Sequence, residues 1–398
     1  MKPLVISAYS TVSAVGQGVN ALRRALQNRE GGLKKNDFEH AELETFVGRV
    51  ESLEEVALSG PYAKFDCRNN RLAEQALVQD GFLEAVAAAR DRYGAHRIGL
   101  FVGTSTSGIL ATELAYRERA GEGPLPSWFR HRHTHDLFSV TDFVSQYLGL
   151  EGPAFSISTA CSSSGKAFSD AHRMITAGLC DAAIVGGVDS LCLTTLYGFH
   201  SLELVSREPC RPFAGDRDGI SIGEAGGFAL LETPDAQRGG FDGVALLGYG
   251  ESSDAYHMST PSPDGHGAAN AMEAALERAG RRPSEVDLVN LHGTATAIND
   301  RAEDRAVLSV IGSETPCSST KGWTGHTLGA AGIIEALISA LCIEEQLIPG
   351  TLNTERRDPE LGSNLQTENR HAPVECVLSN SFGFGGNNCS LVLGKFSC

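Results

Sequence analysis

The chain has 398 residues, 41% of them hydrophobic, with 45 glycines and a formal net charge of −16. The acidic balance excludes a general affinity for nucleic acid or for an anionic membrane, and no stretch approaches the roughly 18 apolar residues of a membrane-spanning helix. The 10 cysteines show no CxxC spacing, and the opening stretch MKPLVISAYS predicts a strand and not a secretion signal. We therefore expect a cytoplasmic protein with reduced thiols and no metal site.

The first half of the chain alternates strand and helix patterns, which indicates an α/β protein. The expected elements are a strand over 1–9, helices over 17–28 and 70–90, a buried strand over 97–105, a helix over 139–150, a strand over 152–159, a helix over 162–177 ended by Gly178, and a strand over 181–190. Strands over 226–232 and 243–255 are expected to pair across the polar link TPDAQRGGFD. That link predicts two halves, 1–238 and 239–398.

The second half repeats this style. The expected elements are a helix over 268–280, a strand over 285–296, helices over 299–312 and 329–346, and two strands within 374–394 joined by a glycine-rich turn. Asn299 or Asp300 would cap the helix that begins near residue 299.

Cys161 lies in STACSSSGKAF, between an expected strand and an expected helix. Backbone N–H groups and the positive end of the helix dipole favour a thiolate at such a position, and the same N–H groups could bind an oxyanion. Most cysteines in such a protein only fill space, so both a packing role and a nucleophilic role stay open on this stretch alone.

Two histidines and a lysine occupy similar glycine-rich turns. His292 ends an apolar strand, where polar side chains of α/β sheets face the usual ligand crevice. His326 and Lys321 share the loop STKGWTGHTLGAAG, and Phe384 lies between glycines in SNSFGFGGNN. One cysteine, two imidazoles and one cation are the groups that thiol-ester chemistry requires.

At this point the sequence resembles a known family. The motifs STACSSSGKAF, RPFAGDRDGISIGEAGG, LHGTATAIND, STKGWTGHTLGAAGIIEA and SNSFGFGGNN occur in this order. Together they resemble the elongating β-ketoacyl-[acyl carrier protein] synthases. The resemblance implies a thiolase-like fold of two duplicated halves in five layers, α-β-α-β-α, and a dimer whose sheets continue across the interface.

The resemblance also implies the reaction, a decarboxylative Claisen condensation in fatty-acid or type II polyketide or polyene elongation. Cys161 would take the acyl chain, while His292 and His326 would assist decarboxylation of the malonyl unit. Lys321 would be the structural cation of the site. The backbone N–H groups of Cys161 and Phe384 would form the oxyanion hole, with Phe384 also acting as the gate.

Further residues match supporting positions of the family. Glu335 matches a buried acid that could pair with Lys321, and Asp300 and Glu303 match acids that follow the first histidine. Thr106, in GTSTSG, matches a position that controls the depth of the acyl channel. No resident cofactor is implied, because the phosphopantetheine arm arrives on the acyl carrier protein.

An acidic acyl carrier protein is the implied partner. It would need a basic patch on this acidic chain, for which the expected residues are Arg68, Arg71, Arg130 and Arg207. The chain would act as a homodimer or as a heterodimer with a ketosynthase-like chain-length factor.

Three alternatives remain on the sequence. A thiolase would need a second late cysteine, whereas Cys376 and Cys389 lie outside the expected turn. A chain-initiating synthase would carry an asparagine in place of His326. A chain-length factor would lack the nucleophile, which is present here.

Ala297 stands where many relatives have proline, and the stretch SREPCRPF is shorter than in many of them. Both departures suggest a specialised branch of the family.

Overall fold

A computed structural model describes residues 1–39, 41–236 and 240–398. Five strands of the first half lie in the spatial order β6, β5, β7, β9, β1. β5 is parallel to β6 and β7, whereas β9 is antiparallel to both β7 and β1. Their bounds are β1 Leu4–Ser13, β5 Ile98–Gly103, β6 Ala154–Ile157, β7 Ala182–Asp189 and β9 Ala225–Glu232.

The second half repeats this arrangement strand for strand. Its order is β12, β11, β16, β17, β10, with β11 parallel to β12 and β16, and with β17 antiparallel to β16 and β10. The bounds are β10 Asp242–Ser253, β11 Leu288–Asn290, β12 Pro316–Ser318, β16 Cys376–Gly383 and β17 Asn387–Ser397. Because order and direction agree in both halves, the expected duplication is confirmed.

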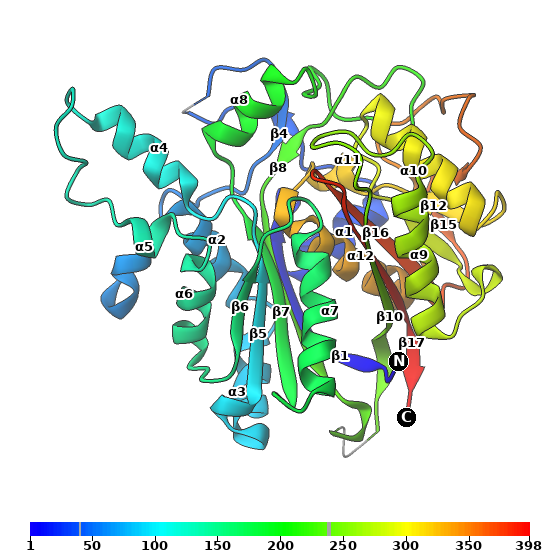
Figure 1. The fold of residues 1–398 in the computed structure, drawn as a ribbon, viewed down its shortest axis with the longest axis horizontal. Coiled ribbons are helices and arrows are strands. Elements are labelled where there is room, and N and C mark those ends of the chain that lie inside the picture. Colours follow the sequence, from blue (N-terminus) through cyan, green and yellow to red (C-terminus); the bar gives the residue numbers. More distant parts are fainter. Residues whose placement is uncertain (40, 237–239) are drawn as a thin grey trace.

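Helices form three layers around these two sets of strands (Figure 1). Helices α2, α3 and α6 pack on the outer face of the first set, and α9 packs with α10 on the outer face of the second. Between the two sets lie α7 and α12, which contact strands of both halves and each other. The expected five layers are therefore present. The helices are α1 Val19–Asn28, α2 Arg68–Leu77, α3 Phe82–Tyr93, α4 Ile109–Glu118, α5 His131–Thr134, α6 Ser139–Leu148, α7 Ser163–Thr176, α8 Leu193–Ser201, α9 His266–Ala279, α10 Ala297–Val310, α11 Lys321–Thr324 and α12 Ala331–Glu345.

The two central helices are long and strongly buried because both faces meet protein. All residues of α12 from Ala331 to Ile343 are buried, which explains its almost uninterrupted apolar sequence. Gly332 allows α12 to cross α7 closely, since a Cβ there would lie 2.4 Å from the backbone nitrogen of Gly165. Ser164 of α7 accepts a hydrogen bond from the Ile333 N–H at 2.9 Å. The helix that follows Cys161 is thereby fixed to the helix that follows His326.

A small sheet of β3, β4 and β8 lies against Thr324, the last residue of α11, and supports the loop that carries His326. Residue 222 forms an isolated parallel bridge with residue 326. The remaining strands are β2 Gly16–Gln17, β3 Lys34–Lys35, β4 Phe46–Gly48, β8 Ile222–Gly223, β13 Leu347–Ile348, β14 Asn364–Leu365 and β15 Arg370–His371.

Four sequence expectations differ from the structure. The strand expected over 285–296 covers only Leu288–Asn290, so His292 lies two residues beyond its end. The helix expected over 70–90 is two helices, α2 and α3, because Asp80 and Gly81 adopt left-handed backbone conformations between them. Strands β9 and β10 do not pair with each other, since β1 lies between them and pairs with both. The cap of α10 is Thr296, which leaves Asp300 in the first turn. The expected boundary at 238/239 lies outside the described residues.

No helix within the described ranges is long and apolar enough to span a membrane.

Candidate active site

Cys161 occupies a tight turn between β6 and α7, as its sequence neighbourhood predicts. Ala160, directly before it, has a φ of 53°, a left-handed conformation that costs energy for a residue with a Cβ. The Ser163 hydroxyl holds the turn by accepting the Thr159 N–H at 2.9 Å and donating to the Ala160 carbonyl at 2.5 Å. The strained turn directs the Cys161 side chain away from the strand, and the side chain is only 5% exposed.

His326 contacts the Cys161 sulfur directly. Its Nε2 lies 3.1 Å from Sγ, and its Nδ1 accepts the backbone N–H of Leu328 at 3.3 Å. A neutral imidazole that accepts at Nδ1 must carry its proton on Nε2. His326 therefore donates an N–H to the sulfur.

His292 is held in the same tautomer by Lys321. Lys321 Nζ lies 3.4 Å from Nδ1 of His292 and donates to the His292 carbonyl oxygen. The ammonium also forms a buried ion pair with Glu335. Because a lysine ammonium can only donate, Nδ1 of His292 accepts and Nε2 carries the proton. The two imidazoles meet edge to face with ring centroids 5.2 Å apart.

Buried carboxylates hold the segment that carries His292. Glu303 accepts the backbone N–H groups of His292 at 2.8 Å and Gly293 at 2.7 Å. Asp300 lies one helical turn earlier and accepts the Phe213 N–H at 2.8 Å, with Arg217 Nε 3.4 Å away. Burial raises the pKa of Glu303 to about 7 and that of Asp300 to about 6.

Burial also determines the protonation of the reacting groups. It raises the pKa of the Cys161 thiol to about 12, although the Lys321 charge and the Phe384 N–H lower it. The stabilised thiolate expected from the helix terminus is thus not the resting state, because loss of solvation outweighs the local donors. Burial and then the Lys321 charge lower the pKa of both His292 and His326 well below the usual range, so both stay neutral.

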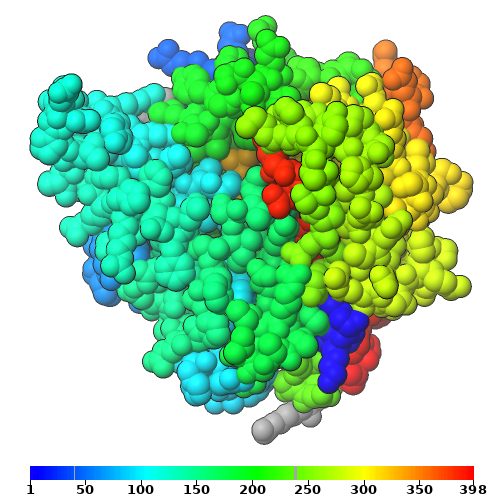
Figure 2. Space-filling view, in the orientation of Figure 1, coloured from blue at the N-terminus to red at the C-terminus, as the bar shows by residue number. Residues whose placement is uncertain are grey.

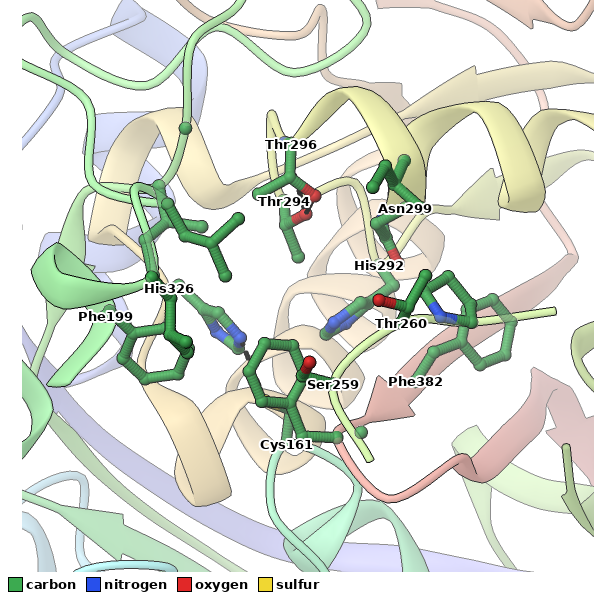
Figure 3. Close-up of a pocket in the computed structure, with 18 of the residues that line it drawn as sticks. Cys161, Phe199, Ser259, Thr260, His292, Thr294, Thr296, Asn299, His326 and Phe382 are labelled. Carbon is green, nitrogen blue, oxygen red and sulfur yellow. Dashed lines mark hydrogen bonds between the residues drawn. The ribbon is translucent and has the colours of Figure 1, made fainter. Parts of the chain in front are cut away.

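The three side chains open into a cavity of about 380 Å³. Figure 3 shows Cys161 and both imidazoles pointing toward one another, with Thr294 and Thr296 across the space above them. The hydroxyls of Thr294 and Thr296 lie 2.9 Å apart. In the space-filling view the turn between β16 and β17, in red, reaches the surface beside segments of both halves (Figure 2).

The turn between β16 and β17 reaches the nucleophile. A Cβ on Gly383 would lie 2.7 Å from the Thr159 carbonyl oxygen and 3.2 Å from the Cys161 nitrogen, so this position needs glycine. Phe384 lines the cavity, and its ring lies 5.4 Å from that of Phe199 on α8. The Phe384 N–H contacts the Cys161 thiol, and Gly383 lies against the Cys161 backbone nitrogen.

The ligand atoms of Cys161, His292 and His326 all lie within 4.8 Å of one another, a spacing that a transition metal could bridge. A metal would require the lone pair of each Nε2. Both Nε2 atoms carry protons here, because a donor faces each Nδ1. The tautomers thus fit hydrogen-bond donation to a substrate oxygen better than they fit metal binding.

The other predicted residues lie away from this cavity. Thr106 is buried, and its hydroxyl donates to Asp189 at 2.9 Å without lining the cavity. Arg68 is buried in an ion pair with Glu224, and half-buried Arg71 pairs with Asp66. Arg130 and Arg207 are exposed. Of the four predicted arginines, Arg68 is therefore wrongly placed on a carrier-binding surface, because its side chain is only 6% exposed.

Several residues of the site were not singled out from the sequence. Asp189 ends β7 and accepts the Gly329 N–H at 2.6 Å, which fixes the segment after His326. Like His292, it is a polar residue at the end of an apolar strand, so the same signal could have found it. Glu224 is an acidic residue between β8 and β9, in a glycine-rich stretch, and this could have indicated a site residue. Phe199 had no signal, since its contact with Phe384 joins segments far apart in sequence.

Comparisons with known proteins place the chain. The family models described as β-ketoacyl synthase, N-terminal domain and C-terminal domain match residues 1–236 and 244–355. The 3-oxoacyl-[acyl-carrier-protein] synthase 2 of Staphylococcus aureus strain COL is 30% identical, over 99% of each chain. A ketosynthase (ApeO) of Xenorhabdus doucetiae, solved in complex with its chain length factor (ApeC), is 38% identical with a TM-score of 0.89, covering 99% of this chain and 98% of that one.

A further solved structure contains a type II polyketide synthase acyl-carrier protein in complex with its ketosynthase. It is 26% identical with a TM-score of 0.86, covering 99% of each chain. The chain belongs to the elongating β-ketoacyl synthase family, whose thiolase fold it shares.

Proposed function

We propose that the chain is a 3-oxoacyl-[acyl carrier protein] synthase, which condenses a Cys161-bound acyl chain with malonyl-acyl carrier protein in fatty-acid or type II polyketide or polyene elongation. One observation carries this proposal. Two neutral imidazoles, each held with its proton on Nε2, point into one cavity with the thiol, and one of them lies 3.1 Å from Sγ.

Acyl transfer is the first step. The Cys161 sulfur attacks the acyl thioester, the carbonyl oxygen becomes an oxyanion, and the carrier thiol leaves with the proton that Cys161 loses. The N–H groups of Cys161 and Phe384 stabilise the oxyanion. Because the resting thiol has a pKa of about 12, the His326 N–H and the Lys321 charge lower the cost of forming the thiolate during attack.

Condensation is the second step. The malonyl thioester oxygen accepts the Nε2–H of His292 and His326, and the bond between the carboxylate and the α-carbon breaks to release carbon dioxide. Its electron pair forms an enolate, whose charge the two N–H donors stabilise. The α-carbon then attacks the acyl-Cys161 carbonyl, the Cys161 thiolate leaves, and a proton from solvent restores the thiol. Neutral donors suit this step, because the charge develops only in the transition state.

No resident cofactor takes part in this scheme, since the phosphopantetheine arm arrives on the carrier protein. Thr294 and Thr296 lie along the cavity that this arm would enter. Arg130 and Arg207 remain the proposed contacts to the acidic carrier, because both are exposed. The expected outcome of Arg207→Glu is a raised KM for the carrier with an unchanged kcat.

The chain would work in the cytoplasm as a homodimer or as a heterodimer with a chain-length factor. The edge strand β6 carries an exposed Phe155, and the Xenorhabdus ketosynthase at 38% identity was solved with such a partner. A working subunit is favoured over a chain-length factor because Cys161 is present beside both histidines.

The test is product formation from purified components. The chain is mixed with acyl carrier proteins that bear different acyl groups and with malonyl-carrier, alone and with a co-expressed chain-length-factor homologue, and the carrier is analysed by mass spectrometry. Appearance of a 3-oxoacyl chain longer by two carbons supports the proposal. Its absence under all these conditions would reject it.

A further inference from the structure

A buried ion pair between Arg68 and Glu224 links the start of helix α2 to the end of β8. The backbone of this short strand is hydrogen-bonded to that of His326. The guanidinium of Arg68, the first residue of α2, binds Glu224 through two parallel hydrogen bonds, Nε to Oε2 at 2.8 Å and a terminal nitrogen to Oε1 at 2.6 Å. Glu224 is fully buried and the Arg68 side chain is only 6% exposed. A charge buried this deeply needs its partner, so each residue fixes the position of the other.

The Glu224 carboxylate also accepts hydrogen bonds from the backbone of two further segments. Its Oε1 accepts the Val50 N–H and its Oε2 accepts the Leu191 N–H, both at 2.9 Å. Its own N–H donates to the Gly48 carbonyl at 2.9 Å. The carboxylate therefore joins the end of β4, the loop after β7 and helix α2 at one point.

The residues just before Glu224 hold the backbone of His326. The His326 N–H donates to the Ser221 carbonyl at 2.7 Å, and the Gly223 N–H donates to the His326 carbonyl at 3.0 Å. Ser221 directly precedes the short strand β8, and Gly223 is its last residue. β8 pairs with β4. The backbone position of His326 thus depends on β8, and β8 is fixed at its end by Glu224.

We propose that Arg68 is a positioning residue, which acts through Glu224 and β8 to place Nε2 of His326 against the Cys161 sulfur. The catalytic role of His326 rests on the proposed function, but its position does not. A carrier-docking role for Arg68 would require an exposed guanidinium, whereas Glu224 and Glu54 already bind this one.

The test replaces the ion pair without leaving a buried charge unpaired. In Arg68→Met/Glu224→Gln both members are neutral and the shape is nearly kept. The control is Arg97→Met/Asp181→Asn, because Arg97 makes the same two-bond contact with Asp181, at 2.9 and 2.8 Å, in a partly exposed ion pair away from the His326 segment. Arg68→Lys keeps the charge but loses the paired geometry.

Two readouts are measured. The first is the rate of Cys161 alkylation by iodoacetamide across pH, which needs no condensing activity and reports the His326 contact. The second is kcat and KM with a carrier-bound acyl donor and with a short pantetheine thioester. We expect alkylation at pH 8 to fall about tenfold and kcat to fall about 10- to 100-fold for both donors, as for a small misplacement of a catalytic group. KM should stay unchanged, Arg68→Lys should recover part of the loss, and the control should match the wild type.

Wild-type alkylation and kcat in the folded double variant would overturn the proposal. A loss confined to KM for the carrier-bound donor would also overturn it, and would assign Arg68 to docking instead. If the double variant does not fold, Arg68→Lys decides between the same outcomes, because it keeps a positive charge beside Glu224 but cannot form both parallel hydrogen bonds. A wild-type chain that alkylates normally but never condenses would reject the proposed function and leave the alkylation result valid.

Discussion

Lys321 Nζ lies 3.4 Å from Nδ1 of His292. This contact fixes the tautomer of His292. The Lys321 ammonium can only donate a hydrogen bond, so Nδ1 accepts it and cannot carry the ring proton. The proton is thereby kept on Nε2, which faces the cavity. The same charge lowers the pKa of the imidazole, so the donor stays neutral and adds no positive charge before the enolate forms.

Replacing Lys321 should shift the pH dependence of condensation. Burial and the Lys321 charge lower the pKa of both His292 and His326, so the wild type keeps neutral imidazoles well below pH 6.5. In Lys321→Met/Glu335→Gln the charge is gone, and the pKa of both rings should rise toward the ordinary value of about 6.5. The acidic limb of the rate profile should move to higher pH. An unmoved limb would contradict the assigned role of Lys321.

The two histidines should differ in the step that they affect. His326 contacts the Cys161 sulfur, whereas His292 contacts Lys321 on its other side. His292→Gln should lower condensation by about 10²- to 10³-fold, the usual effect of removing one such donor, and leave Cys161 acylation near the wild-type rate. His326→Gln should slow both steps. Rapid-quench measurement of the acyl-enzyme separates them, and equal effects of both variants would argue against this division.

A methyl group on Gly383 should damage the proposed oxyanion hole. The added Cβ would lie 2.7 Å from the Thr159 carbonyl oxygen and 3.2 Å from the Cys161 nitrogen, so the turn must move. Acylation in Gly383→Ala should fall by about 10²-fold or more, because one N–H donor is displaced. Gly198→Ala is the control, since nothing lies within 4 Å of the Cβ that it adds. Acylation at the wild-type rate in Gly383→Ala would refute this placement of the hole.

Glu303 should make stability fall as pH rises. Burial raises its pKa from 4.5 to about 7, so the folded protein binds a proton that the unfolded chain has released between these values. Its contribution to the free energy of unfolding is complete below about pH 4.5 and is lost as pH rises through about 7. Glu303→Gln should flatten urea-derived stability over this range, while Glu273→Gln, at an exposed site, should not. The same slope in the wild type and in Glu303→Gln would contradict the raised pKa of Glu303.

The fold and much of the site could be predicted from the sequence. Cys161, His292 and Phe384 each follow a strand, and such strand ends meet at one edge of an α/β sheet. The order of the strands within each half could be predicted only with the duplication that the resemblance implies. The adjacency of β1 to both β9 and β10 could not be predicted, because consecutive strands joined by a short polar link ordinarily form an antiparallel hairpin. Here β9 and β10 run in the same direction, on either side of β1.

The burial of individual side chains, and contacts between residues far apart in the chain, could not be predicted from the sequence. An arginine in a polar stretch such as CRNNR is usually solvated, so the contact of Arg68 with Glu224, 156 positions later, had no local signal. The enclosure that raises the pKa of the Cys161 thiol had no local signal either. A helix terminus is visible in sequence, whereas the enclosure that outweighs it is a property of the folded chain.

The proposed role of Cys161, to carry the growing chain, can be tested directly. We would incubate the protein, with and without a chain-length-factor partner, with acyl-carrier proteins and determine the intact mass and the modified peptide. We expect one acyl group on the peptide that contains Cys161, absent in Cys161→Ala, and its transfer to a 3-oxoacyl carrier after addition of malonyl-carrier. An adduct on another residue, or an adduct that malonyl-carrier cannot discharge, would contradict it.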